Sequence, residues 1–316
     1  MNKIVVKTQN LTKAYGDLTA VDNLSLEIKE GEIFGFLGPN GAGKTTAINM
    51  ICGLLKPDAG EVLIHGVSIT SNRDSFRSLV GVCPQVIVLW ERLTCIEQLQ
   101  FIGQMYGVKG RLARRRGDEL LGEFDLQDKR NKLAKTLSGG MQRRLNLAMA
   151  LVHDPEIVVL DEPEAGLDPQ SRVKVREYIQ SMARVKTVIL TTHNMDEADR
   201  VADRVAIIDH GSLMVLGTPQ NLKEQVGEGD VIEMDIENLN PDVEARIRKS
   251  LANLSQDIFF DSDHKILTFR ALSAIRVIPE ILDGFDAINI QPTNVRIREN
   301  TLEDVFIQLT GRRLRN

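Results

Sequence analysis

A glycine-rich loop between an apolar strand and a helix places the strongest constraint on the fold of this 316-residue chain. The segment Gly38–Thr46 reads GPNGAGKTT, with four residues between Gly38 and the triplet Gly43-Lys44-Thr45. The apolar run Ile33–Leu37 precedes it, and we expect a helix over Lys44–Leu55 to follow. A strand, a loop of this pattern and a helix together form a phosphate-binding loop. The sequence therefore predicts a nucleotide-binding α/β domain.

The residue types of this loop suit a ligand with several negative charges. Backbone N–H groups of a glycine-rich loop converge on a phosphate at the N-terminus of the following helix, and Lys44 adds a positive charge near the outer phosphates. Thr45 supplies a hydroxyl oxygen, a ligand type that suits Mg²⁺. The residues expected to hold the nucleotide are Gly38, Pro39, Asn40, Gly41, Ala42, Gly43, Lys44, Thr45 and Thr46.

A second apolar strand delivers two carboxylates. The run Ile157–Leu160 ends in Asp161-Glu162-Pro163, the Walker B pattern of nucleotide hydrolases. We expect Asp161 to engage Mg²⁺ through water. Glu162 is expected to polarise the attacking water as a general base. Phosphoryl transfer needs positioning and charge neutralisation more than covalent chemistry, and these residues supply both.

Composition limits the class of protein. With 42% hydrophobic and 26% charged residues the chain is typical of a globular protein, and its net charge of −5 argues against broad electrostatic capture of nucleic acid. No apolar run approaches the roughly 18 residues needed to span a bilayer, and the N-terminus lacks a signal-peptide core. Cys52, Cys83 and Cys95 show no metal-type spacing, so we expect reduced thiols with structural roles in a cytosolic protein.

The apolar pattern divides the chain into an α/β domain over residues 1–226 and a small domain over residues 227–316. In the first domain a helical insertion at about residues 87–150 separates two groups of strands. The continuous apolar runs after the insertion suit parallel strands covered on both faces. The expected strands are Ile4–Thr8, Leu24–Ile28, Ile33–Leu37, Glu61–His65, Ile157–Leu160, Val185–Leu190 and Val205–Ile208.

The small domain is predicted to be a ferredoxin-like βαββαβ unit with an added helix. It shows no phosphate-binding loop, metal spacing or catalytic cluster, so we expect an accessory or dimerisation domain. The predicted elements are a strand at Val231–Glu237, a helix at Pro241–Leu254, strands at Asp257–Phe260 and Ile266–Arg270, a helix at Ser273–Asp283, further strands, and a last helix at Leu302–Thr310.

A second glycine motif narrows the family. The segment Leu137–Arg144 reads LSGGMQRR and precedes a helical apolar pattern, so Ser138 is expected to cap a helix. The amides of Gly139 and Gly140 would then present the positive end of that helix to a phosphate. The stretch LSGGMQ resembles the signature sequence of ABC-type ATPases, which contacts the ATP held by the other subunit. The resemblance therefore implies an ATP site shared between two copies of the chain.

The resemblance to ABC transporter ATP-binding subunits covers about residues 4–226, with all motifs in the family's order. It implies an ABC-type P-loop NTPase core with a RecA-like parallel sheet, an antiparallel β subdomain and the helical insertion. It also implies that His193 contacts the γ-phosphate, that Gln85 reaches Mg²⁺, and that Tyr15 stacks on adenine. Asp168 matches the D-loop, which crosses the dimer interface. The implied activity is ATP hydrolysis.

Distal segments narrow the subtype. DRVAIIDHGSLMVLGTPQNLK and ENTLEDVFIQLTGRRLR are similar to drug-resistance-type export ATPases, with the daunorubicin-resistance group as the nearest comparison. These ATPases pair with a separate membrane permease of the type-2 ABC export class. The resemblance implies ATP, a second copy and that permease as partners, with no specific nucleic acid. It places the chain in the cytoplasm, at the inner face of the cell membrane.

Three alternatives stay open at this point. An importer subunit is the closest, and a neighbouring gene for a binding protein rather than a six-span permease would favour it. A soluble ABC ATPase that acts on ribosomes or DNA usually carries two nucleotide domains or zinc cysteines. A regulatory module without catalysis is disfavoured because Glu162 and His193 are both present.

Two local features have more than one interpretation. Glu164 stands where the family usually has threonine, and we expect a solvated side chain there, the alternatives being a raised pKa of Glu162 or a disturbed interface. The apolar segment Val86–Trp90 contains the only tryptophan of the chain. It suits either a groove for a permease helix or burial in the helical insertion.

Overall fold

The structure is a computed structural model, and it describes residues 3–71, 73–225, 229–237, 239–252, 258–261, 265–272 and 274–311. The chain forms two compact units, which divide between Pro219 and Gln220. The domain boundary expected after residue 226 falls among residues 226–228, which lie outside the described residues, and it stays a prediction. Among the residues that the structure describes, no helix is both long and apolar enough to cross a bilayer.

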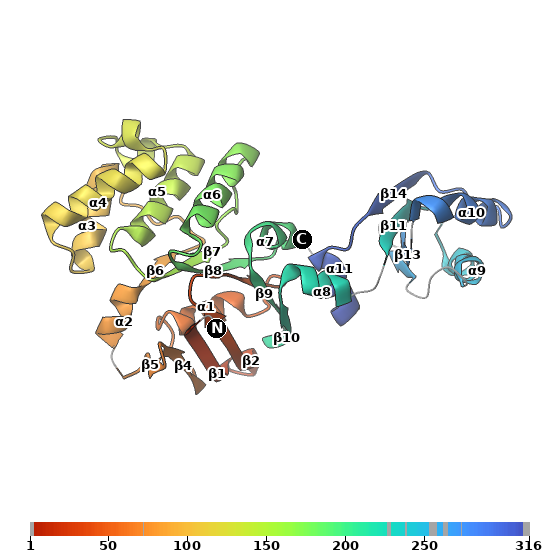
Figure 1. Cartoon of the computed structure of the whole chain (residues 1–316), viewed down its shortest axis with the longest axis horizontal. Coiled ribbons are helices and arrows are strands. Elements are labelled where there is room, and N and C mark those ends of the chain that lie inside the picture. Colours follow the sequence, from red (N-terminus) through yellow and green to blue (C-terminus); the bar gives the residue numbers. More distant parts are fainter. Residues whose placement is uncertain are drawn as a thin grey trace. The chain divides into compact units, whose positions relative to one another are not determined.

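A six-stranded sheet forms the centre of the first unit (Figure 1). Five strands are parallel, and β10 joins β9 in the antiparallel sense. In β7, Val159 lies in one hydrophobic core, whereas Val158 and Leu160 lie in the other. Both faces of the sheet are therefore covered. This confirms the expectation that the continuous apolar runs form parallel strands with both faces buried. In order the strands are β10 (Ser212–Gly217), β9 (Arg204–Asp209), β3 (Ile33–Leu37), β8 (Thr187–Thr192), β7 (Ile157–Asp161) and β6 (Val80–Cys83).

An antiparallel sheet covers one face through helix α1 (Lys44–Ile51), whose apolar side belongs to the core between the two sheets. The helix is shorter than expected because Gly53 adopts a φ of 68° and ends it with hydrogen bonds back into its last turn. In order the strands of this sheet are β2 (Leu18–Lys29), β1 (Ile4–Tyr15), β4 (Ala59–Ile64) and β5 (Val67–Ser68).

Helices cover the other face of the central sheet, and three of them form the expected helical insertion (Figure 1). Thr94 and Glu97 form a capping box that begins the first of these three helices. The insertion contains α3 (Cys95–Met105), α4 (Gly110–Glu123), short 3₁₀ turns at Gln127–Lys129 and Ala134–Thr136, and α5 (Gly139–Leu151). Helices α6 (Pro169–Met182) and α7 (Met195–Val201) also lie on this face. Helix α2 (Arg73–Leu79) contributes Phe76 to the other core, and α8 (Pro219–Gln225) begins at the last residue before the division between the units.

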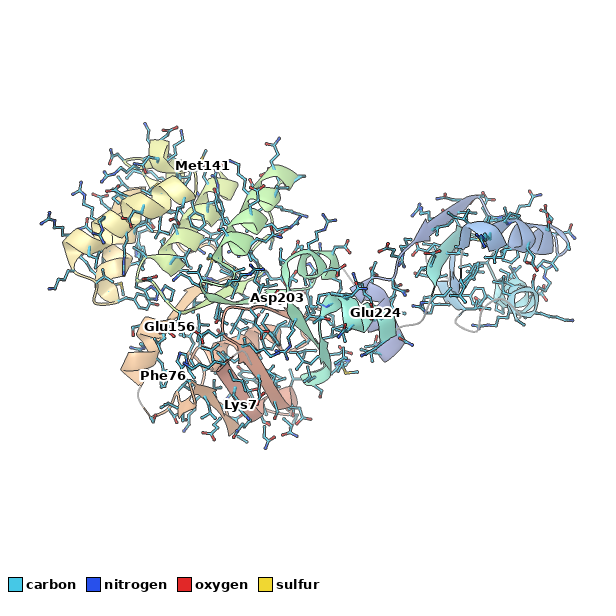
Figure 2. The ribbon with its side chains drawn as sticks, viewed as in Figure 1. Lys7, Phe76, Met141, Glu156, Asp203 and Glu224 are labelled. Carbon is cyan, nitrogen blue, oxygen red and sulfur yellow. The ribbon has the colours of Figure 1, made fainter. Side chains whose placement is uncertain are left out.

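Acidic side chains fix the starts of two central strands, and both acids are labelled in Figure 2. The Oδ2 atom of Asp203 accepts a hydrogen bond from the backbone N–H of Ile33 at 2.8 Å, where β3 begins. Glu156, just before β7, lies 2.8 Å from Nε2 of His65. Strand β8 begins at Thr187, later than expected, because Val185 is 82% exposed in the preceding turn.

The second unit has the strand and helix order predicted from the sequence. Its sheet is antiparallel, and β11 lies between β13 and β14, which gives the order expected of a βαββαβ unit. Helices α9 and α10 share one core with this sheet. Part of the strand expected at Asp257–Phe260 lies outside the described residues. The elements are β11 (Asp230–Asp235), α9 (Pro241–Leu251), β12 (Phe259–Asp261), β13 (Ile266–Ala271), α10 (Ala274–Asp286), β14 (Asn294–Arg298) and the added helix α11 (Leu302–Thr310).

All three cysteines are free thiols, and Cys83 and Cys95 are buried. Burial raises the pKa of the Cys52 thiol to about 12 and that of the Cys83 thiol to about 11. Burial also raises the pKa of Cys95. These thiols therefore stay protonated at neutral pH, which fits the structural roles expected of them.

Candidate active site

Four neighbouring strands bring the sequence motifs to one edge of the central sheet. The strands β3, β8, β7 and β6 are adjacent and parallel, so their carboxyl ends lie side by side. They are followed in that order by the phosphate-binding loop, by His193, by the pair Asp161 and Glu162, and by Gln85. Ligands of open α/β sheets bind at this edge. The topology thus gathers residues that are far apart in the sequence.

The glycines of the phosphate-binding loop are required by its close packing. A Cβ atom on Gly43 would lie 2.1 Å from the backbone oxygen of Ala20, and φ at this glycine is 97°. A Cβ atom on Gly38 would lie equally close to the backbone oxygen of Ile208. Since any side chain at these positions collides with backbone, the loop keeps its shape only with glycine. The contact with Ala20 also places the hairpin of β1 and β2 beside the loop.

Lys44 is buried against the loop that it follows. Its Nζ atom donates hydrogen bonds to the backbone oxygens of Gly38 at 2.7 Å and of Pro39 at 3.0 Å. Burial lowers the pKa of Lys44, while the negative charges of Glu162 and Asp161 act in the opposite direction. The lysine therefore lies within the electrostatic field of both carboxylates at the end of β7.

The backbone holds Asp161 and Glu162 in a fixed arrangement. Both side chains are buried, and Glu162 has a positive φ of 47°. The N–H of Glu162 donates to the backbone oxygen and to the hydroxyl of Thr191, each at 3.1 Å. The hydroxyl of Thr191 in turn donates to Oδ1 of Asp161. Neighbouring strand β8 therefore orients both acids.

His193 contacts the expected base directly. Its Nδ1 atom lies 2.9 Å from Oε1 of Glu162, and the side chain of His193 is 44% exposed whereas that of Glu162 is 8% exposed. A carboxylate only accepts hydrogen bonds, so Nδ1 carries the proton in this contact. Next to it, Asn194 caps α7 by accepting hydrogen bonds from two backbone N–H groups. The structure thus joins two residues whose contact the sequence did not indicate.

The expected Mg²⁺ ligands are oxygen atoms at this edge. Thr45 and Gln85 are exposed, and Asp161 offers a second carboxylate oxygen besides the one bonded to Thr191. Among the described residues no group of three or more His, Cys, Asp and Glu side chains has the arrangement of a metal cage. A hydroxyl, an amide and one carboxylate fit Mg²⁺ that is also bound by nucleotide phosphates.

The signature segment and the D-loop of the same chain lie against each other. Ser138 caps α5, its hydroxyl accepting a hydrogen bond from the N–H of Met141 at 3.4 Å. Gly139 is exposed, and a Cβ atom on Gly140 would lie 2.3 Å from the hydroxyl of Ser171. Asp168 caps α6 by accepting a hydrogen bond from the backbone N–H of Ser171 at 3.1 Å, and it also accepts one from that same Ser171 hydroxyl at 2.7 Å. Ser138 and Gly139 are thus exposed at the N-terminus of α5 while Gly140 is buried, and their contact with the ATP of a second copy stays a prediction.

Tyr15 ends β1 in the hairpin that borders the phosphate-binding loop. Its side chain is 51% exposed, with Nζ of Lys13 at 5.7 Å from the ring centroid. An exposed ring at this place suits stacking, and its role toward adenine stays a prediction.

Comparisons with known proteins agree with this geometry. The family model described as ABC transporter matches residues 21–165. The linearmycin resistance ATP-binding protein LnrL of Bacillus subtilis is 36% identical over 99% of this chain and 100% of its own length. The daunorubicin/doxorubicin resistance ATP-binding protein DrrA of Streptomyces peucetius is 37% identical over 97% of this chain and 92% of its own length.

The chain belongs to the ABC transporter ATP-binding proteins. A solved dimeric ATP-binding cassette in a post-hydrolysis state with ADP and Pi aligns with a TM-score of 0.62 and 30% identity, over 67% of this chain and 98% of that one. This ABC protein is an ATP-hydrolysing subunit that uses ATP and Mg²⁺. The relatives above are resistance proteins, and a Nod factor export ATP-binding protein of Ralstonia nicotianae is 36% identical over 99% of the chain and 95% of its own length. The expected export class is confirmed.

One expectation about this ABC protein is wrong. Glu164 is not solvated but only 2% exposed, and its carboxylate makes two hydrogen bonds to the guanidinium of Arg176, at 3.2 and 2.8 Å. The pair forms because α6 runs back over the loop after β7. Glu164 also affects a neighbour: burial raises the pKa of Glu197, and the charges of Glu164 and Glu162 raise it further.

Sequence reasoning also missed Arg143, which lies in the signature helix of the ABC protein and is 2% exposed. The same holds for Thr191, which orients both acids at the end of β7. An arginine beside a glycine motif is usually a solvated residue, so no pattern in the sequence distinguished Arg143.

Proposed function

We propose that this chain supplies the energy for export through a separate membrane permease, as one of two identical ATP-binding subunits at the inner face of the cell membrane. The observation that carries the proposal is an exposed apolar surface directly after Gln85. Val86 is 73% exposed, Val88 52% and Trp90 39%. Apolar side chains beside a residue expected to sense Mg²⁺ suit a partner helix that follows the state of the nucleotide.

The helical insertion extends this surface. Phe101 and Met105 of α3 are 41% and 66% exposed, and the Trp90 ring meets Phe101 edge to face with the centroids 5.1 Å apart. The backbone N–H of Trp90 donates to Oε1 of the fully buried Gln98 at 3.0 Å, which fixes the segment on α3. A permease helix with apolar residues fits this surface, which we call the docking surface: Val86, Val88, Trp90, Phe101 and Met105.

Each nucleotide would be held by residues of two chains. The phosphate-binding loop and Lys44 hold the outer phosphates, and Ser138, Gly139 and Gly140 of the second copy face the γ-phosphate at the N-terminus of α5. Asp168 lies beside that N-terminus and would cross the interface. The solved dimeric cassette with ADP and Pi supports this arrangement, because it resembles this chain in both sequence and fold. ATP then favours the closed dimer by linkage, because it binds both surfaces.

Hydrolysis follows from the contacts at the ends of β7 and β8. Glu162 accepts a proton from water while the water oxygen bonds to the γ-phosphorus and the bond to the bridging oxygen breaks, which gives ADP and phosphate. His193 holds the Glu162 carboxylate through Nδ1, and its exposed ring would then contact the γ-phosphate of a bound ATP. Mg²⁺, when bound by Thr45, Gln85 and Asp161, neutralises charge on the phosphates.

Two variants test this proposal. Glu162→Gln removes the base without changing the volume, so we expect ATP binding to persist, turnover to fall by roughly 10²- to 10⁴-fold, and an ATP-bound dimer to appear by light scattering. Wild-type turnover by this variant would contradict the assignment of the base. Ser138→Arg fills the N-terminus of α5, so turnover should be lost while the monomer still binds ATP.

The permease is tested by co-purification. From solubilised membranes we expect wild-type protein to retain a membrane permease, which should be lost when Val86 and Val88 are replaced by Asp. A matched control is Val185→Asp, at a valine that is 82% exposed elsewhere on the same unit. Equal retention of the permease by all three proteins would contradict the docking surface.

A further inference from the structure

Arg143 of helix α5 joins the two catalytic loops of its own chain. Its side chain is fully buried, and within the part of the chain that the structure describes its guanidinium donates hydrogen bonds only to backbone oxygens. Two of these oxygens belong to the loop after β6, and three belong to the last residue of β7 and the loop that follows it. The distances from the guanidinium nitrogens are 2.6 Å to Pro84, 3.2 Å to Gln85, 2.8 Å to Asp161, 2.9 Å to Glu162 and 3.0 Å to Pro163.

The chemistry of arginine explains why this residue type is present. A guanidinium has five N–H donors in a rigid plane, and the five backbone oxygens use all of them. None of these bonds goes to a carboxylate. The cation therefore adds no ion pair that would neutralise Glu162 or Asp161, and their carboxylate oxygens stay available. A lysine has three donors around one point and cannot span both loops in this way.

A second contact docks the same helix on the same strand end. Nδ2 of Asn146, three residues after Arg143, lies 3.2 Å from Sγ of Cys83, the last residue of β6. Both contacts are buried. Helix α5 is thus fixed to the start of the Gln85 loop along its first two turns, while its N-terminal Ser138 and Gly139 are exposed.

We propose that Arg143 is a positioning residue that sets the Gln85 loop and the Glu162 base in one geometry and moves them together with the signature helix. The inference rests on the proposed function, in which the N-terminus of α5 contacts the ATP of the second copy. Closure on that ATP then changes the chain's own base and its own Gln85 loop through one side chain. Its hydrogen-bond acceptors are backbone oxygens of these two segments, so Arg143 acts through them.

The neighbouring arginine provides a matched control. Arg144 lies on the same helix and is 8% exposed, but its contacts are with Phe124 and Asp125 of the helical insertion, including an ion pair to the Asp125 carboxylate, and with Tyr178 of α6. Its Nη1 atom donates to the backbone oxygens of Phe124 at 2.7 Å and Asp125 at 3.4 Å. Replacement of either arginine removes buried hydrogen bonds of a similar kind. Only Arg143 reaches the catalytic loops.

The test compares Arg143→Lys, Arg143→Gln and Arg144→Lys in the full-length chain. Three quantities are measured: ATP affinity with a fluorescent nucleotide, kcat per mole of nucleotide-binding protein, and the change in Trp90 fluorescence on addition of ATP and Mg²⁺. Trp90 is the only tryptophan and lies just after Gln85, so it reports on that loop. The fluorescence change is measured in the Glu162→Gln background, where ATP is expected to be consumed only slowly.

For both Arg143 variants we expect ATP affinity within about twofold of wild type, a kcat lower by on the order of 10²-fold, and loss of the Trp90 response. Arg144→Lys should lower the melting temperature as much as Arg143→Lys does, and it should keep the Trp90 response and most of its turnover. Normalisation to nucleotide-binding protein removes the contribution of any unfolded fraction.

A wild-type kcat and Trp90 response in Arg143→Lys would overturn the inference. Equal losses of kcat in Arg143→Lys and Arg144→Lys would also overturn it, since they would reflect stability alone. These assays use no permease, so a permease that fails to co-purify bears on the proposed function and leaves this result unchanged.

Discussion

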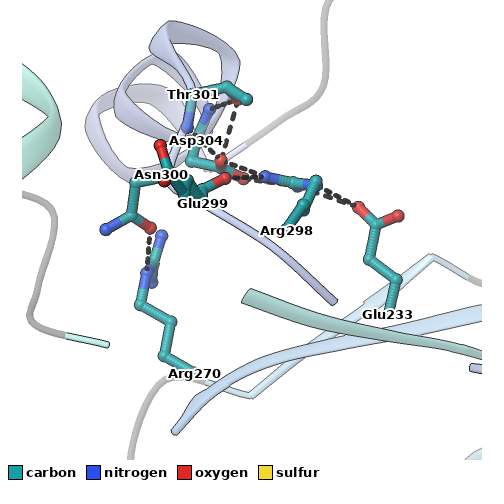
Figure 3. A network of polar contacts seen from close by, with 7 residues as sticks. All are labelled: Glu233, Arg270, Arg298, Glu299, Asn300, Thr301 and Asp304. Carbon is teal, nitrogen blue, oxygen red and sulfur yellow. Dashed lines mark hydrogen bonds and ion pairs between the residues drawn. The ribbon is translucent and has the colours of Figure 1, made fainter. Parts of the chain in front are cut away.

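Two arginines, one in each unit, show how differently the same side chain is used. Arg143 in the nucleotide-binding unit is fully buried and bonds only to backbone oxygens. Arg298 in the accessory unit is 31% exposed at its side chain and bonds to two carboxylates, Glu233 at 2.8 Å and Asp304 at 2.6 Å (Figure 3). The first arrangement fixes backbone and leaves the acids free, whereas the second neutralises acids and joins two elements.

The two kinds of arginine contact reflect different chemical requirements of the two units. A catalytic edge must keep charged oxygens available, so its loops are held by a cation that does not pair with them. The accessory unit has no such demand, and there Arg298 of β14 ties Glu233 of β11 to the first turn of α11. Variants of these ion pairs should therefore change stability and leave chemistry intact.

The largest expected change in stability comes from the ion pair between Glu164 and Arg176. This pair lies in the nucleotide-binding unit, but like the pairs of Arg298 it joins an arginine to a carboxylate. Arg176→Met leaves the Glu164 carboxylate, whose side chain is 3% exposed, without its cation. An uncompensated buried charge costs about 3–5 kcal/mol, so urea unfolding followed by Trp90 fluorescence should move to lower urea.

The double variant Glu164→Thr with Arg176→Met removes both charges and should recover most of this loss. An unchanged urea midpoint in Arg176→Met would show that Glu164 is stabilised by something other than Arg176.

Arg298→Met is expected to cost about 2–3 kcal/mol in the accessory unit, because Asp304 keeps its Thr301 contacts and Glu233 reaches solvent. The kcat for ATP should not change. Hydrogen exchange of α11 and β14 measures the first effect and an ATPase assay the second. Arg296→Met on the same strand serves as the control, since Arg296 is exposed. A loss of turnover in Arg298→Met would contradict the view that Arg298 serves stability alone, in contrast to Arg143.

Acid should weaken the accessory unit through Asp304. Burial acts to raise the pKa of Asp304, but hydrogen bonds from Arg298 and Thr301 bring it below the ordinary value of 3.8. A carboxyl group with a lowered pKa in the folded state stabilises above pH 3.8, and this contribution is lost as the pH falls through the lowered pKa. The protection factors for hydrogen exchange of α11, corrected for the intrinsic exchange rate at each pH, should therefore fall below about pH 4, and Asp304→Asn should flatten this pH profile.

The smallest expected effect compares two capping boxes. Thr94 and Glu97 begin α3 at an exposed site, and Thr301 and Asp304 begin α11 at a part-buried one. Thr94→Ala should cost about 1 kcal/mol. Thr301→Ala should cost more, since it also leaves Asp304 with one partner fewer. Equal melting temperatures of the two variants would contradict this ranking.

Features that depend on neighbours in the sequence were predictable. The strand and acid pair at Ile157–Glu162 follows from a run of apolar residues and a change to charge, and the βαββαβ order of the second unit follows from alternating apolar patterns. The phosphate-binding loop was predictable because the backbone geometry of the loop requires glycine at fixed positions of the motif.

Features that depend on partners far away in the sequence were not predictable. Glu164 looked solvated because charged residues usually are, and only the path of α6 brings Arg176 onto it. The same is true of Arg143, whose acceptors lie in two loops far along the chain in either direction, and of the contact between His193 and Glu162. Such pairings are set by strand order, which a single sequence does not contain.

The three buried or half-buried thiols have a practical consequence for labelling chemistry. Because the pKa of Cys52 is about 12 and that of Cys83 about 11, maleimides at neutral pH meet almost no native thiolate. The variant Ser138→Cys, made with all three native cysteines retained, would carry an exposed thiol that reacts before the native ones. Spin labels or cross-linkers attached there would measure the approach of two copies without removal of a single native cysteine.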